Sequence, residues 1–166
     1  MGRWRPPAPQ SSPYITPAGF DALQAELKAL WLRRRDVVAA LAAAAAEGDR
    51  SENAEYIYRK KELGGLDYRI RYLQKRLPVL NVVRELANSD AVYFGATVQV
   101  RNDAGELFTY RLVGADEADP GSHDISIDSA LAKSLRGKRV GDDVQISTTD
   151  KSTTYTIESI RYTQRF

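Results

Sequence analysis

The sequence predicts an α+β protein, in which a long antiparallel coiled-coil hairpin is followed by a small antiparallel β domain with one short helix. In two stretches of the first half, apolar residues recur at alternating intervals of three and four, which is typical of coiled coils. After Pro78 apolar and polar residues alternate, which is typical of strands. We therefore expect a flexible tail over 1–13, a coiled coil over 14–79 and a second domain over 80–166.

The first helix is expected over 17–46, a length of about 45 Å. Thr16 is a good N-cap residue, and Pro17 suits the first helical position because its missing N–H would have no partner there. Arg34 interrupts the apolar stripe; it either fixes the register or joins a basic patch with Arg33 and Arg35. The stripe consists of Phe20, Leu23, Leu27, Leu30, Val37, Leu41 and Ala44.

The second helix repeats this spacing and ends before Pro78. Gly48 stops the first helix, and Asp49 or Ser51 can cap the second. The short turn requires the two helices to be antiparallel. The second stripe, interrupted by Arg59, consists of Tyr56, Leu63, Leu66, Ile70, Leu73 and Leu77.

The second domain is expected to contain several short strands and one helix. Period-two patterns mark the strands, and a turn signal over 102–105 joins the first two of them. A helix is expected over 129–135, ended by Gly137. The predicted strands are 98–100, 108–113, 124–127, 144–146 and 153–162.

Composition excludes several classes of protein. Hydrophobic residues make up 43% and charged residues 28% of the 166, as in globular proteins. No stretch approaches the roughly 20 apolar residues of a membrane span, and the N-terminus lacks the apolar core of a secretory signal. The chain has no cysteine, which excludes disulfides and thiolate metal sites. We expect a cytoplasmic protein with no membrane association.

Charge is unevenly distributed, with an excess of basic residues in the first half and of acidic residues in the second. This asymmetry suggests that the first half meets a polyanion or an acidic protein surface, although a solvated helix face is the alternative. On the second helix the basic residues are Arg59, Lys60, Lys61, Arg69, Arg71, Lys75 and Arg76.

Acidic residues gather at the tip of the predicted hairpin. Asp49 and Glu52 lie three residues apart at the start of the second helix, and Glu55 follows one turn later. Acids in this position are favoured by the helix dipole, and the same spacing suits a site for Mg²⁺. Because Mg²⁺ takes about six oxygen ligands, a second molecule would have to supply the others.

The stretch GDRSENAEY, from Gly48 to Tyr56, resembles the tip signature of the Gre transcript cleavage factors, and the basic second helix resembles the GreB branch of that family. Parts of the second half are also similar to the family's C-terminal domain. They are 94–96, 110–114, 125–129 and 131–144.

The resemblance implies a transcription elongation factor with an FKBP-like C-terminal domain. That domain would dock on bacterial RNA polymerase while the coiled coil enters the secondary channel and stimulates cleavage of backtracked RNA at its 3′ end. Asp49 and Glu52 match the family's essential acidic pair and would hold Mg²⁺ jointly with the polymerase. Ser51, Asn53 and Glu55 match supporting positions of the tip.

The protein would then be a monomer that completes the polymerase's nuclease without being an enzyme itself. The basic residues of the second helix would guide the extruded RNA. The alternative function is that of a Gre-fold protein that binds the polymerase and modulates or inhibits transcription without cleavage.

Overall fold

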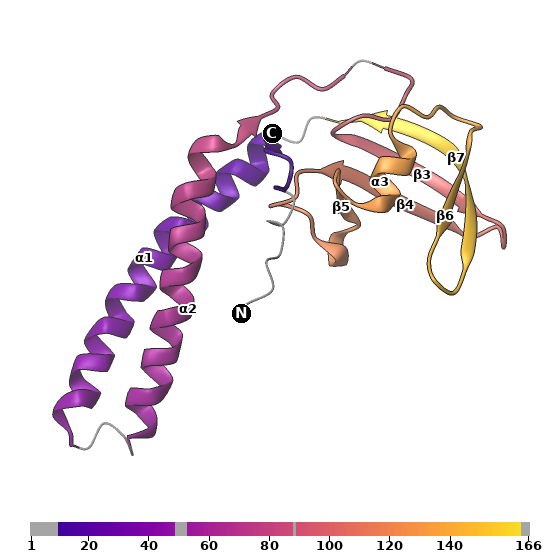
Figure 1. Ribbon diagram of the computed structural model, residues 1–166. Coiled ribbons are helices and arrows are strands. Elements are labelled where there is room, and N and C mark those ends of the chain that lie inside the picture. Colours follow the sequence, from indigo (N-terminus) through magenta and orange to yellow (C-terminus); the bar gives the residue numbers. More distant parts are fainter. Residues whose placement is uncertain (1–9, 49–52, 88, 164–166) are drawn as a thin grey trace, which may run out of the picture. The chain divides into compact units, whose positions relative to one another are not determined.

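The computed structural model of the protein describes residues 10–48, 53–87 and 89–163, which form two compact units (Figure 1). One unit is the hairpin, Phe20–Leu80, and the other joins the residues before it to Asn81–Phe166. The predicted fold class, a helical hairpin followed by a small β domain, is confirmed. Residues 14–19 group with the second unit rather than with the coiled coil, because they pair with the chain beyond the hairpin.

The hairpin consists of α1, Pro17–Ala46, and α2, Ala54–Arg76, which run side by side in Figure 1. The bounds of α1 agree with the prediction. The apolar stripe of each helix supplies the buried residues, since a helix of this length needs a partner for its apolar face. They are Leu23, Val37 and Ala44 on α1, and Ile70 and Leu73 on α2. No helix in the described part of the chain has both the length and the hydropathy of a membrane span.

The start of α2 corrects the prediction that Asp49 or Ser51 caps it. Asn53 is the N-cap: its backbone is extended, and its side chain accepts a hydrogen bond from the backbone N–H of Tyr56 at 3.1 Å. Asp49 and Ser51 lie outside the described residues. At the other end α2 passes into a short 3₁₀ turn, Leu77–Val79, which holds Pro78.

Arg34, the polar interruption of the first stripe, lies between the helices. Its Nε donates to Oδ1 of Asp67 at 2.6 Å, a contact between the two helices of the kind expected if this position fixes their register. Each side chain is 35% exposed, and a pair at that exposure adds roughly 0–1 kcal/mol. The Arg34–Asp67 ion pair therefore adds little to the free energy of unfolding, and its main expected effect is on the alignment of the two helices.

The second unit contains a five-stranded sheet in the order β5-β4-β3-β7-β6 (Figure 1). All neighbours are antiparallel except β4 and β5, which are parallel, so the expectation of a wholly antiparallel sheet is wrong at this edge. The strands are β3 Ala96–Asn102, β4 Leu107–Val113, β5 Asp124–Ser126, β6 Asp143–Ser147 and β7 Ser152–Tyr162.

One short helix, α3 (Ala130–Leu135), covers the sheet's core. Ser129 caps it by accepting from the backbone N–H of Ala132. Alternate residues of the central strands face the same cluster, as a period of two requires. Its buried members include Val98, Val100, Leu112, Leu135 and Ile157.

A small second sheet was not anticipated. It pairs β1, Tyr14–Ile15, with β2, Asn81–Val82, in parallel. Beside it Glu117 accepts from the backbone N–H and the hydroxyl of Thr16, and from the backbone N–H of Gly114. Gly114 lies so close to β1 that a Cβ there would be 2.0 Å from the carbonyl oxygen of Tyr14.

Candidate functional site

The acidic motif lies in the connection between the two long helices. Since α1 ends at Ala46 and α2 begins at Ala54, Asp49, Ser51 and Glu52 all belong to this connection, and all three lie outside the described residues. Gly48, on its α1 side, has a φ of 141°, a conformation that favours glycine. At the tip, the structure therefore describes the residues on either side of the acidic motif, up to Gly48 and from Asn53.

Asn53 joins the ends of the two helices. Its Oδ1 caps α2, and its Nδ2 donates to the carbonyl oxygen of Ala44 at 2.8 Å. Ala44 lies in the last turn of α1, and its carbonyl oxygen also accepts from the backbone N–H of Glu47 at 3.3 Å. An asparagine suits this position because its amide both donates and accepts. Asn53 therefore links the start of α2 directly to the last turn of α1.

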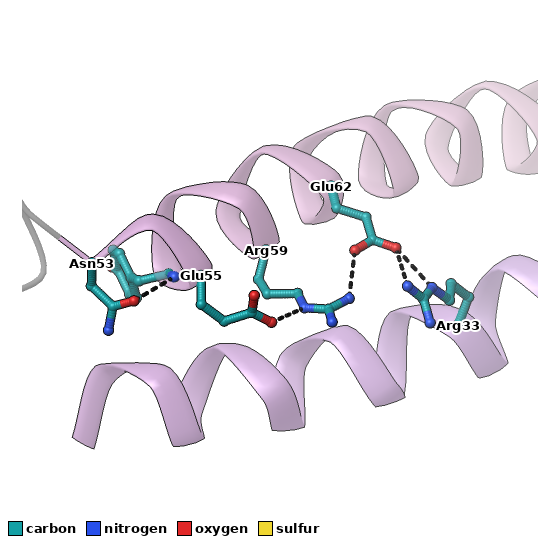
Figure 2. A network of polar contacts seen from close by, with 6 residues as sticks. Arg33, Asn53, Glu55, Arg59 and Glu62 are labelled. Atoms are coloured by element: carbon teal, nitrogen blue, oxygen red, sulfur yellow. Dashed lines mark hydrogen bonds and ion pairs between the residues drawn. The ribbon is translucent and has the colours of Figure 1, made fainter. Parts of the chain in front are cut away.

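Glu55 begins a chain of charged contacts that crosses the hairpin (Figure 2). It accepts from Nε of Arg59 at 2.7 Å, and Arg59 also contacts Glu62 at 3.1 Å. On α1, Arg33 reaches the same carboxylate of Glu62 at 2.6 Å. The hydrogen bond from Arg33, aided by Arg59, lowers the pKa of Glu62 below its ordinary value. Hydrogen bonds to Glu55 and Glu62 raise the pKa of Arg59.

These contacts bear on which groups could hold a metal ion. Glu55, which matches a supporting position of the tip, is engaged by Arg59. The described ranges contain no cluster of three metal-binding side chains. Two carboxylates match the hard oxygen ligands that Mg²⁺ prefers but leave most of its coordination sites open. The donor set of this chain therefore fits Mg²⁺ only as an ion shared with another molecule.

The predicted basic face divides into two groups. Arg59 and Arg69 are partly exposed and paired with carboxylates of the hairpin, Arg69 by a bidentate contact with Glu26 at 2.6 and 3.0 Å. Arg76 is half-buried. The other four side chains are exposed and form no ion pair with any residue of the described ranges. They are Lys60, Lys61, Arg71 and Lys75.

These four residues lie on one side of α2. At 100° per residue they fall within about 100° of the helix circumference, so they form a single cationic face. Sequence alone did not separate them from Arg69, because its partner Glu26 belongs to the other helix. Arg59 differs, since its partners Glu55 and Glu62 lie on α2 itself, four residues before it and three residues after it. The ion pairs Arg33–Glu62 and Arg69–Glu26 join residues that lie beside the apolar stripe of each helix. The antiparallel packing of the helices brings these residues together.

Comparisons with known proteins identify the family of this chain. The family model "Transcription elongation factor, N-terminal" matches residues 13–82, and "Transcription elongation factor, GreA/GreB, C-term" matches residues 87–162. The chain is 53% identical to transcription elongation factor GreB of Xanthomonas axonopodis pv. citri, over 98% of each chain. It is 48% identical to GreB of Pseudomonas aeruginosa, again over 98% of each.

Among solved structures, Gfh1 of Thermus aquaticus is 23% identical with a TM-score of 0.43, covering 91% of this chain and 99% of that one. The two family models together span nearly the whole sequence, and the GreB relatives match it from end to end. The chain therefore belongs to the GreA/GreB family of transcription elongation factors and is GreB-like.

Proposed function

We propose that this protein enters the secondary channel of bacterial RNA polymerase and stimulates endonucleolytic cleavage of backtracked nascent RNA, which rescues arrested complexes. The observation that carries the proposal is the position of the acidic motif. Asp49 and Glu52 lie in the connection of a hairpin whose helices have 30 and 23 residues. Such a hairpin extends about 35–45 Å, so it can bring two carboxylates to a site that a globular domain cannot reach.

The proposed chemistry belongs to the polymerase, and this chain supplies part of the metal site. Asp49 and Glu52 would hold Mg²⁺ together with carboxylates of the polymerase. When bound, the ion activates water and offsets charge on the phosphodiester. Asn53 supports this role by tying α2 to Ala44, which restricts the positions open to the acidic pair. The protein is accordingly not an enzyme by itself.

The cationic face of α2 has a role in the same proposal. Lys60, Lys61, Arg71 and Lys75 are exposed and face one side, so they can contact phosphates of the extruded RNA. Such contacts are independent of sequence, as a factor that acts on any transcript requires. Its partners are RNA polymerase and the nascent RNA 3′ end, and it acts as a monomer in the cytoplasm.

The test is cleavage of labelled RNA in stalled, backtracked polymerase complexes with the purified protein added. We expect Asp49→Asn and Glu52→Gln each to reduce stimulated cleavage to the level of polymerase alone, because each removes one anionic metal ligand. Glu47→Gln is the matched control: it removes an exposed acid beside the motif and should leave cleavage unchanged. Wild-type cleavage by Asp49→Asn would refute the metal role. Slower transcription without cleavage by the wild-type protein would favour the alternative of a channel-binding modulator.

A further inference from the structure

Three large aromatic side chains are exposed on the solvent face of α2. Tyr58 is 60%, Tyr68 71% and Tyr72 37% exposed. At 100° per residue they lie within about 80° of one another, and the middle of this arc is about 160° from the buried Ile70 and about 100° from the buried Leu73. None of the three belongs to the buried residues of the hairpin. Exposed aromatic rings aligned on one face are typical of a binding surface.

Lysines interleave with these rings. Lys61 lies between Tyr58 and Tyr68 in sequence, Lys75 follows Tyr72, and both lysines point from the same side of the helix. Neither forms an ion pair with a residue in the described part of the chain. We call these five residues the tyrosine–lysine stripe. Alternating rings and cations are the two components with which proteins bind single-stranded nucleic acid.

Two of the rings are held in place by arginines. The guanidinium of Arg59 lies over the ring of Tyr58 at 5.4 Å, and that of Arg69 lies over the ring of Tyr72 at 5.3 Å. Both arginines are themselves fixed by carboxylates of the hairpin. Their cation–π contacts therefore orient the rings before any ligand arrives, which reduces the entropy lost on binding.

Gly64 and Gly65 lie on the same side, between Lys61 and Tyr68. A Cβ at either position would meet nothing within 4 Å, so neither close packing nor a turn accounts for them. Each costs α2 about 1 kcal/mol of helix propensity relative to alanine. They leave a stretch without side chains on this side between Lys61 and Tyr68, whose Cα atoms are about 10 Å apart along the helix. Beside it, a surface hollow of about 370 Å³ is lined by Tyr58, Lys61 and Glu62.

We propose that the tyrosine–lysine stripe binds single-stranded RNA, with bases stacked on Tyr58, Tyr68 and Tyr72 and phosphates contacted by Lys61 and Lys75. The physiological ligand rests on the proposed function, since the extruded RNA is the single strand that such a hairpin would meet. The occupant follows from charge and shape: the lysines complement phosphates, and planar bases fit between exposed rings. An acidic protein surface would match the lysines but would leave the rings and the glycine gap without a role.

The stripe is tested without polymerase, by fluorescence anisotropy of a labelled oligouridine RNA titrated with the full chain. Tyr68→Leu keeps an apolar side chain but removes the ring, and we expect binding at least about five-fold weaker. The triple change of Tyr58, Tyr68 and Tyr72 to Leu should weaken binding further, whereas changing all three to Phe should keep it within about two-fold. Trp31→Leu, which removes a 46% exposed ring from α1, is the matched control and should have no effect.

Salt dependence separates the two components. Lys61→Gln with Lys75→Gln should lower the slope of log affinity against log salt by about 1.4, since each phosphate contact contributes about 0.7 for single strands. The Tyr→Leu changes should weaken binding and leave that slope unchanged. A duplex RNA of equal length should bind more weakly than the single strand, because pairing hides the base faces while keeping the phosphates.

Equal binding by wild type and Tyr68→Leu, or equal loss with Trp31→Leu, would overturn the proposal. So would a triple Leu variant that binds RNA normally but loses affinity for polymerase, since the stripe would then be a protein contact. RNA binding by a wild-type protein that fails to stimulate cleavage would refute the proposed function while supporting the stripe. Circular dichroism of each variant checks that it is still helical. Tyr68→Leu is the change least expected to affect folding, because the Tyr68 side chain is 71% exposed.

Discussion

Replacing Asn53 is expected to loosen the tip of the hairpin by a predictable amount. Asn53→Ala removes an N-cap, at a cost of about 1 kcal/mol, and a hydrogen bond to Ala44, at a cost of about 1 kcal/mol. Asn53→Asp keeps the capping oxygen and loses only the donor to Ala44, so it should cost about half as much. Comparing the two variants therefore separates the free energy contributed by the N-cap from that contributed by the hydrogen bond to Ala44.

The assay is thermal unfolding of the hairpin followed by tryptophan fluorescence. The chain has two tryptophans, so a Trp4→Phe background leaves Trp31 of α1 as the reporter. For a unit the size of Phe20–Leu80, each kcal/mol shifts the midpoint by about 4–8 °C. We expect a shift of about 8–16 °C for Asn53→Ala and of about half that for Asn53→Asp. Stimulated cleavage should fall in the same order, because the acidic pair lies in the connection that Asn53 closes.

Two results would refute this reasoning. An unchanged midpoint in Asn53→Ala would show that neither hydrogen bond stabilises the hairpin. Equal shifts for Asn53→Ala and Asn53→Asp would show that the capping oxygen contributes nothing. Asn53→Ser is a further control, since serine is a good N-cap residue but is too short to replace the amide donor.

Three further predictions follow from other contacts. Gly114→Ala should destabilise the second unit by about 1–3 kcal/mol in urea unfolding, because the added Cβ would lie 2.0 Å from the Tyr14 carbonyl oxygen. Gly64→Ala should instead stabilise the hairpin by about 0.5–1 kcal/mol, because the added Cβ meets no atom within 4 Å. Folding lowers the pKa of Glu62 below 4.5, so the ionised Glu62 stabilises the hairpin fully above about pH 4.5, and this stabilisation is lost as pH falls through the folded pKa. The difference in unfolding midpoint between wild type and Glu62→Gln should therefore shrink below that pH. A difference that stays constant with pH would contradict the ion-pair role. Reversing Lys60, Lys61, Arg71 and Lys75 to Glu should impair cleavage of RNA backtracked by many nucleotides more than by a few, whereas equal loss at every length would indicate a docking role.

The long helices could be predicted because their apolar pattern extends over many turns. Thr16 and Pro17 gave a clear start for α1, and the stripe from Leu23 to Ala44 gave its buried face. The start of α2 was placed too early because several residues of the tip are good caps. The choice of Asn53 depends on a partner in the other helix, the carbonyl of Ala44, which sequence spacing alone does not reveal.

The strands of the second unit were located because alternation marks a strand wherever it occurs. Alternation carries no direction, however, so the parallel pairing of β4 with β5 was missed. The two-residue strands β1 and β2 are too short for any period. For the candidate site, the spacing of Asp49 and Glu52 suggested only a capped helix or a shared metal site, and the family resemblance decided between them.

The pairing of β1 with β2 makes the second unit discontinuous in sequence, and this has a consequence for synthesis on the ribosome. All contacts within Phe20–Leu80 are available once residue 80 has emerged, so the hairpin can fold while translation continues. The hydrogen bond from Thr16 to Glu117 can form only after a further 101 residues have been synthesised. The pairing of β3 with β7 can form only when β7, near the end of the chain, has emerged. The hairpin that carries the acidic motif can therefore fold before the second unit is complete.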